Sequence, residues 1–154
     1  MKFQPTAVLI ICLGMFFGCQ SVDTDSAKDS EEIRIVSLSP GISQTLVDLG
    51  YSDNIVGRSA FCTAIPLTVP VVGDLLGVDY ERLRKLHPSH VFVQKTESQI
   101  DQHLVNLSQS GAFALQSWKL DRLEDIKELV LGLSTQLGDS PEELTIILEG
   151  EKQI

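Results

Sequence analysis

Cysteine is scarce in this sequence, and the places where it occurs exclude two kinds of site. The three cysteines are Cys12, Cys19 and Cys62. Cys12 lies inside an apolar N-terminal run and Cys19 closes that run, which leaves Cys62 as the one cysteine of the remaining chain. A lone cysteine supports neither an internal disulfide framework nor a cysteine-rich metal site.

Basic side chains are also in short supply. The chain has 12 Lys and Arg against 21 Asp and Glu, a net charge of −9. Such an acidic chain argues against nucleic acid as a partner and against an electrostatic hold on anionic lipid. A composition of 43% hydrophobic and 21% charged residues over 154 positions is nevertheless that of one globular domain rather than of a disordered acidic tail.

Long apolar runs are missing as well, because the run from Ala7 to Phe17 is too short to cross a bilayer as a stable helix. With Lys2 before it, this run predicts an export signal over residues 1–18. Its ending, "MFFGC", resembles the lipobox of bacterial lipoproteins, which implies lipidation at Cys19 and a membrane anchor. A plain signal peptide cut nearby and an uncleaved anchor are the alternatives. All three place the rest of the chain outside the cytoplasm, in the periplasm or cell envelope.

The next segment, residues 19–32, has little that could bury itself. Between Gln20 and Glu32 the single large apolar residue is Val22, and Ser and Asp are frequent. We expect a disordered tether between an anchor and a folded domain.

From residue 33 onward, short apolar runs alternate with helical patterns. Strands of this kind, apolar on both faces, predict an α/β fold with a parallel sheet covered by helices on both faces. Gly50 is a helix stop signal. The expected strands are 33–38, 54–57, 69–73, 89–93 and 112–115, and the expected helices are 42–49, 79–86, 98–110 and 122–137.

The last segment, "DSPEELTIILEGEKQI", begins with a strong helix start. Ser140 is a good N-cap, Pro141 suits the first helical position, and two glutamates follow near the positive end of the helix dipole. Its apolar residues, Leu144, Ile147 and Leu148, need a surface to pack against.

Patterns that would indicate catalysis or nucleotide binding are missing. The stretch "SLSPGISQT" after the first strand contains neither GxGxxG nor GxxxxGK[ST], which disfavours a dinucleotide-binding enzyme. The sequence has no GxSxG elbow, and no histidine is expected beside Ser39 or Cys62 to activate them. We therefore expect a protein that is not an enzyme, with enzymatic activity kept as a minor alternative.

Several motifs, taken together and in this order, resemble the periplasmic binding proteins of the cobalamin and iron-siderophore class, the external receptors of ABC importers. They are "RIVSLSP" (34–40), "LGYSDNIVGRSAFC" (49–62), "VPVVG" (69–73), "DYERLRKLHPSHVFV" (79–93) and "QLGDSPEE" (136–143). The resemblance implies two α/β lobes joined by one long helix, with ligand clamped between them. Residues 33–139 would then be the N-terminal Rossmann-like lobe and residues 140–154 the start of the inter-lobe helix, with the second lobe absent.

The resemblance also implies a function. Such a protein captures cobalamin, an iron-siderophore or a haem-like ligand in its cleft and delivers it to an ABC permease, with no cofactor besides that ligand. The alternative is a truncated or stand-alone lobe that acts as a protein-interaction domain without transport. Because one lobe offers half a cleft, we expect the isolated chain to bind cobalamin weakly, if at all.

The first candidate binding residues are Ser39, Pro40 and Gly41. They place backbone N–H groups and a helix N-terminus at the carboxyl end of the first strand, where open parallel sheets hold ligands. A helix start capped by Ser39, with no ligand, is the alternative.

The second candidate pair, Phe61 and Cys62, lies in "RSAFCTAIP". The resemblance gives Phe61 the place of an aromatic residue that packs on a large planar ligand. Thr63 and Ile65 stand near positions where family members often have an Asp and a second aromatic residue. The alternative is that Phe61 and Cys62 are ordinary core residues.

Two acidic residues complete the expected site. Asp74, in "GDLLG", is expected in a second cleft loop, with plain turn chemistry as its alternative. Glu97 matches the family's docking glutamate, which pairs with arginines on the permease; its alternative is an acid favoured by the dipole at a helix start.

His87 and His90 do not make a convincing metal site, because Pro88 separates them and the resemblance puts them at the sheet edge opposite the cleft. His103 is expected far away in a helix. Trp118 is expected to seal the lobe rather than to line the cleft.

Overall fold

The computed structural model describes residues 32–74 and 76–138. The predictions for the signal segment, Cys19 and the tether up to residue 31, and for the helix starting near Ser140, lie outside the described residues. The fold can therefore be tested between the first strand and the end of the helix predicted at 122–137.

Five parallel strands form one sheet in the order β3-β2-β1-β4-β5. Each pairing is parallel, with Ile35 of β1 opposite both Ile55 of β2 and His90 of β4. The predicted parallel α/β fold is confirmed. The strands are β1 (Ile35–Ser37), β2 (Ile55–Ser59), β3 (Val71–Gly73), β4 (His90–Val93) and β5 (Ala114–Ser117).

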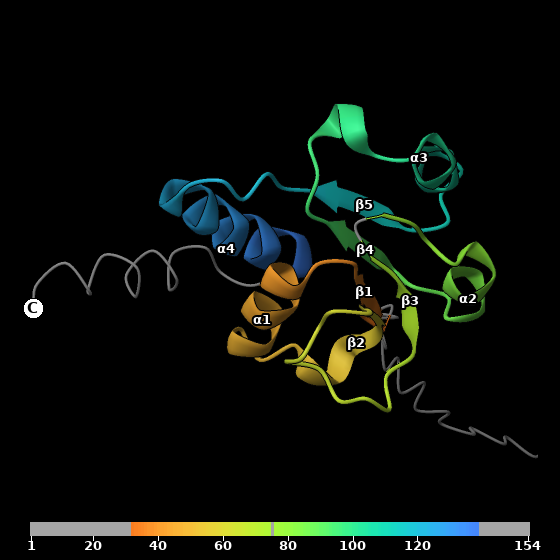
Figure 1. Cartoon of the computed structure of the whole chain (residues 1–154), viewed down its shortest axis with the longest axis horizontal. Coiled ribbons are helices and arrows are strands. Elements are labelled where there is room, and N and C mark those ends of the chain that lie inside the picture. Colours follow the sequence, from red (N-terminus) through yellow and green to blue (C-terminus); the bar gives the residue numbers. More distant parts are fainter. Residues whose placement is uncertain (1–31, 75, 139–154) are drawn as a thin grey trace, which may run out of the picture. The chain divides into compact units, whose positions relative to one another are not determined.

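Helices cover both faces of the sheet, as Figure 1 shows. α1 (Pro40–Asp48) and α4 (Leu123–Leu137) lie on one face, while α2 (Tyr80–Lys85) and α3 (Gln102–Gln109) lie on the other. Two short 3₁₀ turns, η1 (Ser52–Asn54) and η2 (Glu97–Gln99), precede β2 and α3.

Side-chain alternation along the strands produces two hydrophobic cores, one on each face. In β1, Ile35 faces α1 and α4 whereas Val36 faces α2 and α3, and both are fully buried. Phe92 of β4 joins the first core, and its neighbours Val91 and Val93 join the second. Strands buried on both faces must be apolar at successive positions, which explains the short β-branched runs of the sequence.

Local signals set several element boundaries. Pro40 occupies the first turn of α1, where its missing N–H costs nothing. Gly50 ends that helix in the left-handed region, at φ 88°, and its N–H donates to the Val47 carbonyl at 3.0 Å. The predicted helix stop is thus confirmed.

Most predicted bounds differ from the observed ones by one or two residues, and the last strand and the helix before it show the clearest differences. The last strand begins at Ala114, two residues later than expected, and the helix expected from residue 98 begins at Gln102. Thr96 and Gln99 form a reciprocal cap around η2 instead, and Asp101 caps α3 through the N–H of His103. Within the described ranges, no helix is long and apolar enough to span a membrane.

Candidate ligand-binding site

The winding of the sheet brings the predicted site residues to one edge. β2 and β3 lie on one side of β1, and β4 and β5 lie on the other, so the chain reverses its winding direction between β1 and β4. A crevice at such a reversal is where doubly wound sheets hold ligands. We call the residues that follow the strands the carboxyl edge; Ser39, Phe61, Asp74 and Glu97 all belong to it.

A short hydrogen bond joins the two strand ends at this reversal. The Ser39 hydroxyl donates to Oε1 of Gln94 at 2.6 Å, and Ser39 is fully buried. Ser39 is the N-cap residue of α1, but its side chain makes no capping bond. Ser39 thus occupies the N-cap position that the alternative gave it, although its hydroxyl donates to Gln94 and makes no capping bond; its ligand role stays a prediction.

Sequence reasoning missed Gln94. Its one signal was its position directly after the apolar strand "HVFV", which places it at the carboxyl edge beside the end of β1. Because Oε1 accepts from Ser39, the Gln94 amide is fixed next to Gly41, which has Gln94 Oε1 within 3.9 Å of its Cβ position.

A hollow of about 430 Å³ opens beside this pair of residues. Gly41 and Thr45 of α1 and Gln94 form one wall, and the start of α4 forms the other. Leu123 and Ile126 of α4 line it while remaining 72% and 46% exposed. Gly41 of the predicted wall lines this hollow, whereas Ser39 and Pro40 are not among its lining residues, and the ligand role of all three stays a prediction.

The loop after β2 separates the two members of the second candidate pair. Phe61 is 69% exposed, so it is free to contact a ligand. Cys62 is 2% exposed and packs in the α1–α4 core with Ile65. The alternative of an ordinary core residue therefore fits Cys62 but does not fit the exposed Phe61. The ligand roles of both residues stay predictions.

The two acidic candidates are held in different ways. Asp74 Oδ1 accepts the N–H groups of Leu76 at 2.7 Å and Gly77 at 3.1 Å, which is the turn chemistry that was its alternative. Glu97 is exposed and is the first residue of η2. An exposed carboxylate is available to a partner, and its docking role stays a prediction.

The histidines lie away from the carboxyl edge or apart from one another. His87 and His90 precede and begin β4, at the opposite edge of the sheet. Among residues 32–74 and 76–138, no three His, Cys, Asp or Glu side chains are grouped so that they could hold a metal ion. The structure confirms the edge expected for His87 and His90.

Trp118 seals the lobe, as predicted. Its ring meets Phe92 edge-on, with centroids 5.5 Å apart. A Cβ placed on Gly132 of α4 would lie 2.9 Å from the Trp118 ring, so the helix and the indole are in close contact.

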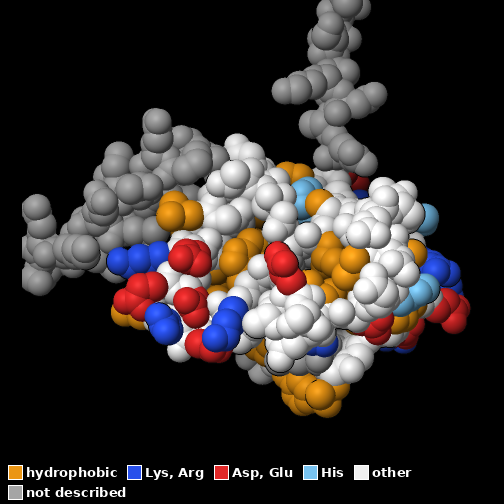
Figure 2. Space-filling view, turned by 90° about the horizontal axis from the view of Figure 1, so that it is seen from above, with side chains coloured by type: hydrophobic (Ala, Val, Ile, Leu, Met, Phe, Trp, Pro, Cys, Tyr) orange, Lys and Arg blue, Asp and Glu red, His pale blue; other side chains and the backbone are white. Residues whose placement is uncertain are grey.

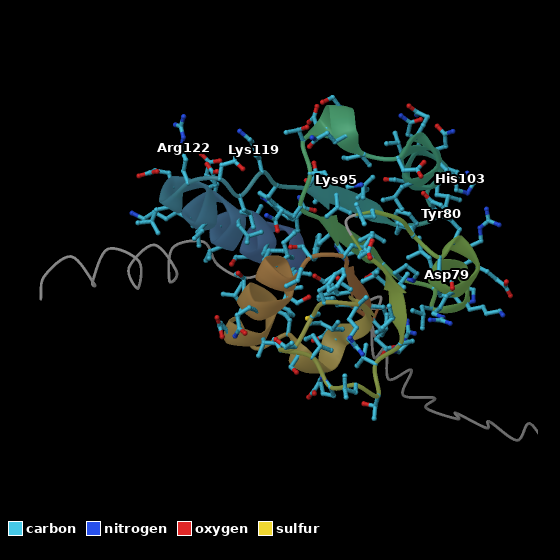
Figure 3. All side chains as sticks on the ribbon, viewed as in Figure 1. Asp79, Tyr80, Lys95, His103, Lys119 and Arg122 are labelled. Atoms are coloured by element: carbon cyan, nitrogen blue, oxygen red, sulfur yellow. The ribbon has the colours of Figure 1, made fainter. Side chains whose placement is uncertain are left out.

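Charged side chains are unevenly distributed around the edge. Figure 2 shows Lys, Arg, Asp and Glu side chains gathered on the side of α4 and in a second group at the opposite end, with hydrophobic patches and polar areas between them. Figure 3 places Lys119 and Arg122 where α4 begins, and Lys95 beyond the end of β4. Lys119 pairs with Asp121 at 2.5 Å, which raises the pKa of the Lys119 amine.

A polar cluster marks the point where α2 and α3 begin. The N–H of His103 donates to Asp101 Oδ1 at 2.8 Å and holds the pKa of Asp101 below its usual range. Tyr80 packs against the His103 ring, with centroids 4.4 Å apart (Figure 3). The Tyr80 hydroxyl is shielded from water and lies beside the Asp101 carboxylate; burial first, and then the neighbouring carboxylate as acceptor and charge, raises the pKa of Tyr80 to about 12.

The fold and the edge together define a doubly wound α/β domain of the kind that holds ligands at the carboxyl ends of its strands. Comparison with known proteins gives the family: the periplasmic binding protein model matches residues 35–136. The chain belongs to that family, which is a class of solute-binding proteins rather than of enzymes.

The relatives and solved structures agree with this assignment. The "High-affinity heme uptake system protein IsdE" of Staphylococcus aureus strain Newman is 27% identical over 136 residues, which cover 86% of this chain and 43% of the relative. The periplasmic heme binding protein HutB of Vibrio cholerae superposes with a TM-score of 0.66 at 18% identity, covering 79% of this chain and 47% of that one.

Two further structures broaden the range of ligands among the neighbours. Staphylococcus aureus IsdE complexed with heme has a TM-score of 0.61 at 25% identity and covers 79% of this chain and 47% of its own. The periplasmic vitamin B12 binding protein BtuF of Vibrio cholerae has a TM-score of 0.55 at 22% identity, and the match covers 66% of this chain and 40% of BtuF. This chain spans less than half the length of these proteins.

The raised pKa of Tyr80 predicts a pH dependence of folding. An unfolded tyrosine ionises near pH 10 and the folded one near 12, so stability present below pH 10 is lost as the pH rises toward 12. We expect Tyr80→Phe to reduce this alkaline loss, because the ionisable hydroxyl is removed.

Urea unfolding midpoints measured from pH 7 to 11 check this prediction. Coinciding curves for the wild type and Tyr80→Phe would contradict it.

Proposed function

We propose that this chain is the ligand-binding lobe of the substrate-binding component of an ABC importer for haem, cobalamin or an iron-siderophore. The observation that carries the proposal is an exposed aromatic ring, Phe61, at the carboxyl edge of a periplasmic binding protein lobe. Exposing an apolar ring to water is unfavourable in the free protein. When a large planar ligand covers the ring, apolar surface is buried and the two ring systems stack.

A hollow at the same carboxyl edge supports the same class of ligand. The hollow beside Gly41 and Gln94 offers an apolar surface from Leu123 and Ile126 together with polar groups. Ligand pockets combine these properties, since apolar walls supply burial and a few polar groups fix orientation. Haem is the first ligand to test, because the curated relative is a haem uptake protein and several structural neighbours bind haem.

In this proposal the protein captures its ligand at the carboxyl edge and passes it to a permease without chemical change. The described residues supply one wall of the cleft. A ligand held on that wall alone stays largely exposed to water, so we expect the described lobe to bind its ligand weakly.

Phe61 tests the binding proposal directly. We expect Phe61→Ala to weaken haem binding about tenfold, since truncating an aromatic anchor removes most of its contact area. Leu67→Ala is the matched control, because Leu67 is 84% exposed in the same loop but lies near the start of β3. Absorbance titrations of the three proteins measure the affinities. Equal affinities for wild type and Phe61→Ala would contradict the role of Phe61. A wild-type chain that shows not even weak binding of haem, cobalamin or a ferric siderophore at the highest soluble ligand concentration would contradict the function.

We also propose that the chain is exported and anchored through a lipid on Cys19. The support is the lipobox-like "MFFGC" and the envelope location that the family implies. We expect Cys19→Ala to move the protein from the membrane fraction of cells to the soluble envelope fraction, with Cys12→Ala as the control that leaves it in place. Unchanged partitioning of Cys19→Ala would show that the anchor lies elsewhere.

A further inference from the structure

A buried arginine holds the loop that carries Phe61. Arg58, in β2, is 6% exposed, and among the described residues no carboxylate lies within ion-pair distance of it. Burying a guanidinium without a carboxylate is costly, so its hydrogen bonds have to compensate for the lost water.

The Arg58 side chain donates those hydrogen bonds to backbone carbonyls at the two ends of one loop. Nε donates to the Val69 carbonyl at 3.0 Å, and Nη1 donates to the carbonyls of Ser59 at 3.1 Å and Cys62 at 3.4 Å. The loop between β2 and β3 runs from residue 60 to residue 70, and these acceptors lie at its start and its end. The planar guanidinium thus ties both ends of the loop together.

Backbone bonds also order this loop. The Ala60 N–H donates to the Gly73 carbonyl at 2.9 Å, the Phe61 N–H to the Ser59 hydroxyl at 3.3 Å and the Cys62 N–H to the Ser59 carbonyl at 3.2 Å. At the other end, the Val69 N–H donates to the Pro66 carbonyl at 3.0 Å, but among these bonds the Arg58 guanidinium alone reaches carbonyls at both ends. Cys62 and Ile65 are buried in the core, which leaves Phe61 on the outer side. Fixing the carbonyls on either side of the loop therefore fixes the direction in which Phe61 projects.

We propose that Arg58 is a positioning residue that holds the 60–70 loop, and with it the Phe61 ring, in place at the carboxyl edge. This inference rests on the proposed function, because Arg58 affects the ligand only if Phe61 contacts the ligand. Lysine cannot replace the arginine, because a single ammonium lacks the fork that reaches carbonyls on two sides.

The chain offers a matched control. Arg34 also binds backbone carbonyls, donating from Nη2 to Leu86 at 2.9 Å and from Nε to His87 at 3.3 Å, but it does so at the opposite edge of the sheet. Arg34 differs in being 34% exposed and 3.9 Å from the Glu32 carboxylate. Both Arg58→Lys and Arg34→Lys nevertheless remove guanidinium–carbonyl bonds, and only Arg58→Lys removes them from the loop.

Hydrogen exchange tests the clamp without any ligand. We expect Arg58→Lys to speed amide exchange across residues 60–70 and Arg34→Lys to speed it around residues 86–90. Equal exchange of residues 60–70 in wild type and Arg58→Lys would overturn the proposal, whether or not any ligand binds. In case Arg58→Lys does not fold, the side-chain Nε–H of wild-type Arg58 is expected to exchange slowly by NMR, and rapid exchange there would overturn the clamp.

Haem titration tests the positioning role. We expect Arg58→Lys to weaken haem binding about tenfold and Arg34→Lys to change it less than about twofold, because the loss acts through Phe61. In the Phe61→Ala background, Arg58→Lys should weaken binding less than about twofold further. A full additional loss in that background would show that Arg58 does not act through Phe61. Failure of wild-type haem binding would count against the proposed function, while the exchange result would still decide the clamp.

Discussion

The pairing of β1 with both β2 and β4 is the constraint on which the rest of the structure depends. Because β1 lies at the centre of a parallel sheet, the chain must wind outward in one direction through β3 and then return to build β4 and β5 on the other side. Parallel strands need crossovers, and these place helices on both faces. The same winding collects every strand end at one edge.

Packing at the centre of the sheet is tight enough to fix this arrangement. A Cβ placed on Gly57 of β2 would lie 2.6 Å from Val72 of β3 and 3.0 Å from Val36 of β1. Glycine at this position therefore lets side chains from both neighbouring strands meet over β2. Buried serines form hydrogen bonds where the chain leaves β1. The Ser43 hydroxyl donates to the Ser37 hydroxyl at 2.9 Å, and the Ser39 hydroxyl donates to Gln94. Those bonds fix the wall of the hollow.

Much of the fold was predictable from the sequence, for a physical reason. Strands buried on both faces need apolar residues at successive positions, and helix ends such as Gly50 carry strong local signals. The edge position of Ser39 followed from parallel winding, whereas Phe61 and Asp74 were placed there through the family resemblance. The start of β5 was predicted two residues too early, because residues 112 and 113 are as apolar as those that follow. Pairing of β5 with β4 begins only at Ala114.

The missed features depend on partners that are distant in the sequence. Nothing near Gln94 indicates that it accepts from Ser39, and a charged residue such as Arg58 at a strand position is usually read as exposed. The burial of Cys62 beside an exposed Phe61 likewise depends on how the 60–70 loop packs against α1 and α4. The wall of the site could be predicted, but the bonds that hold it could not.

The most direct test of a ligand site at the carboxyl edge is an amide chemical-shift titration of the wild-type chain with gallium protoporphyrin, a diamagnetic analogue of haem. NMR detects the weak binding expected of one wall. Shifts concentrated at Gly41, Phe61 and Gln94 are the predicted result. Shifts concentrated at the opposite edge, around His87 and His90, would contradict the account.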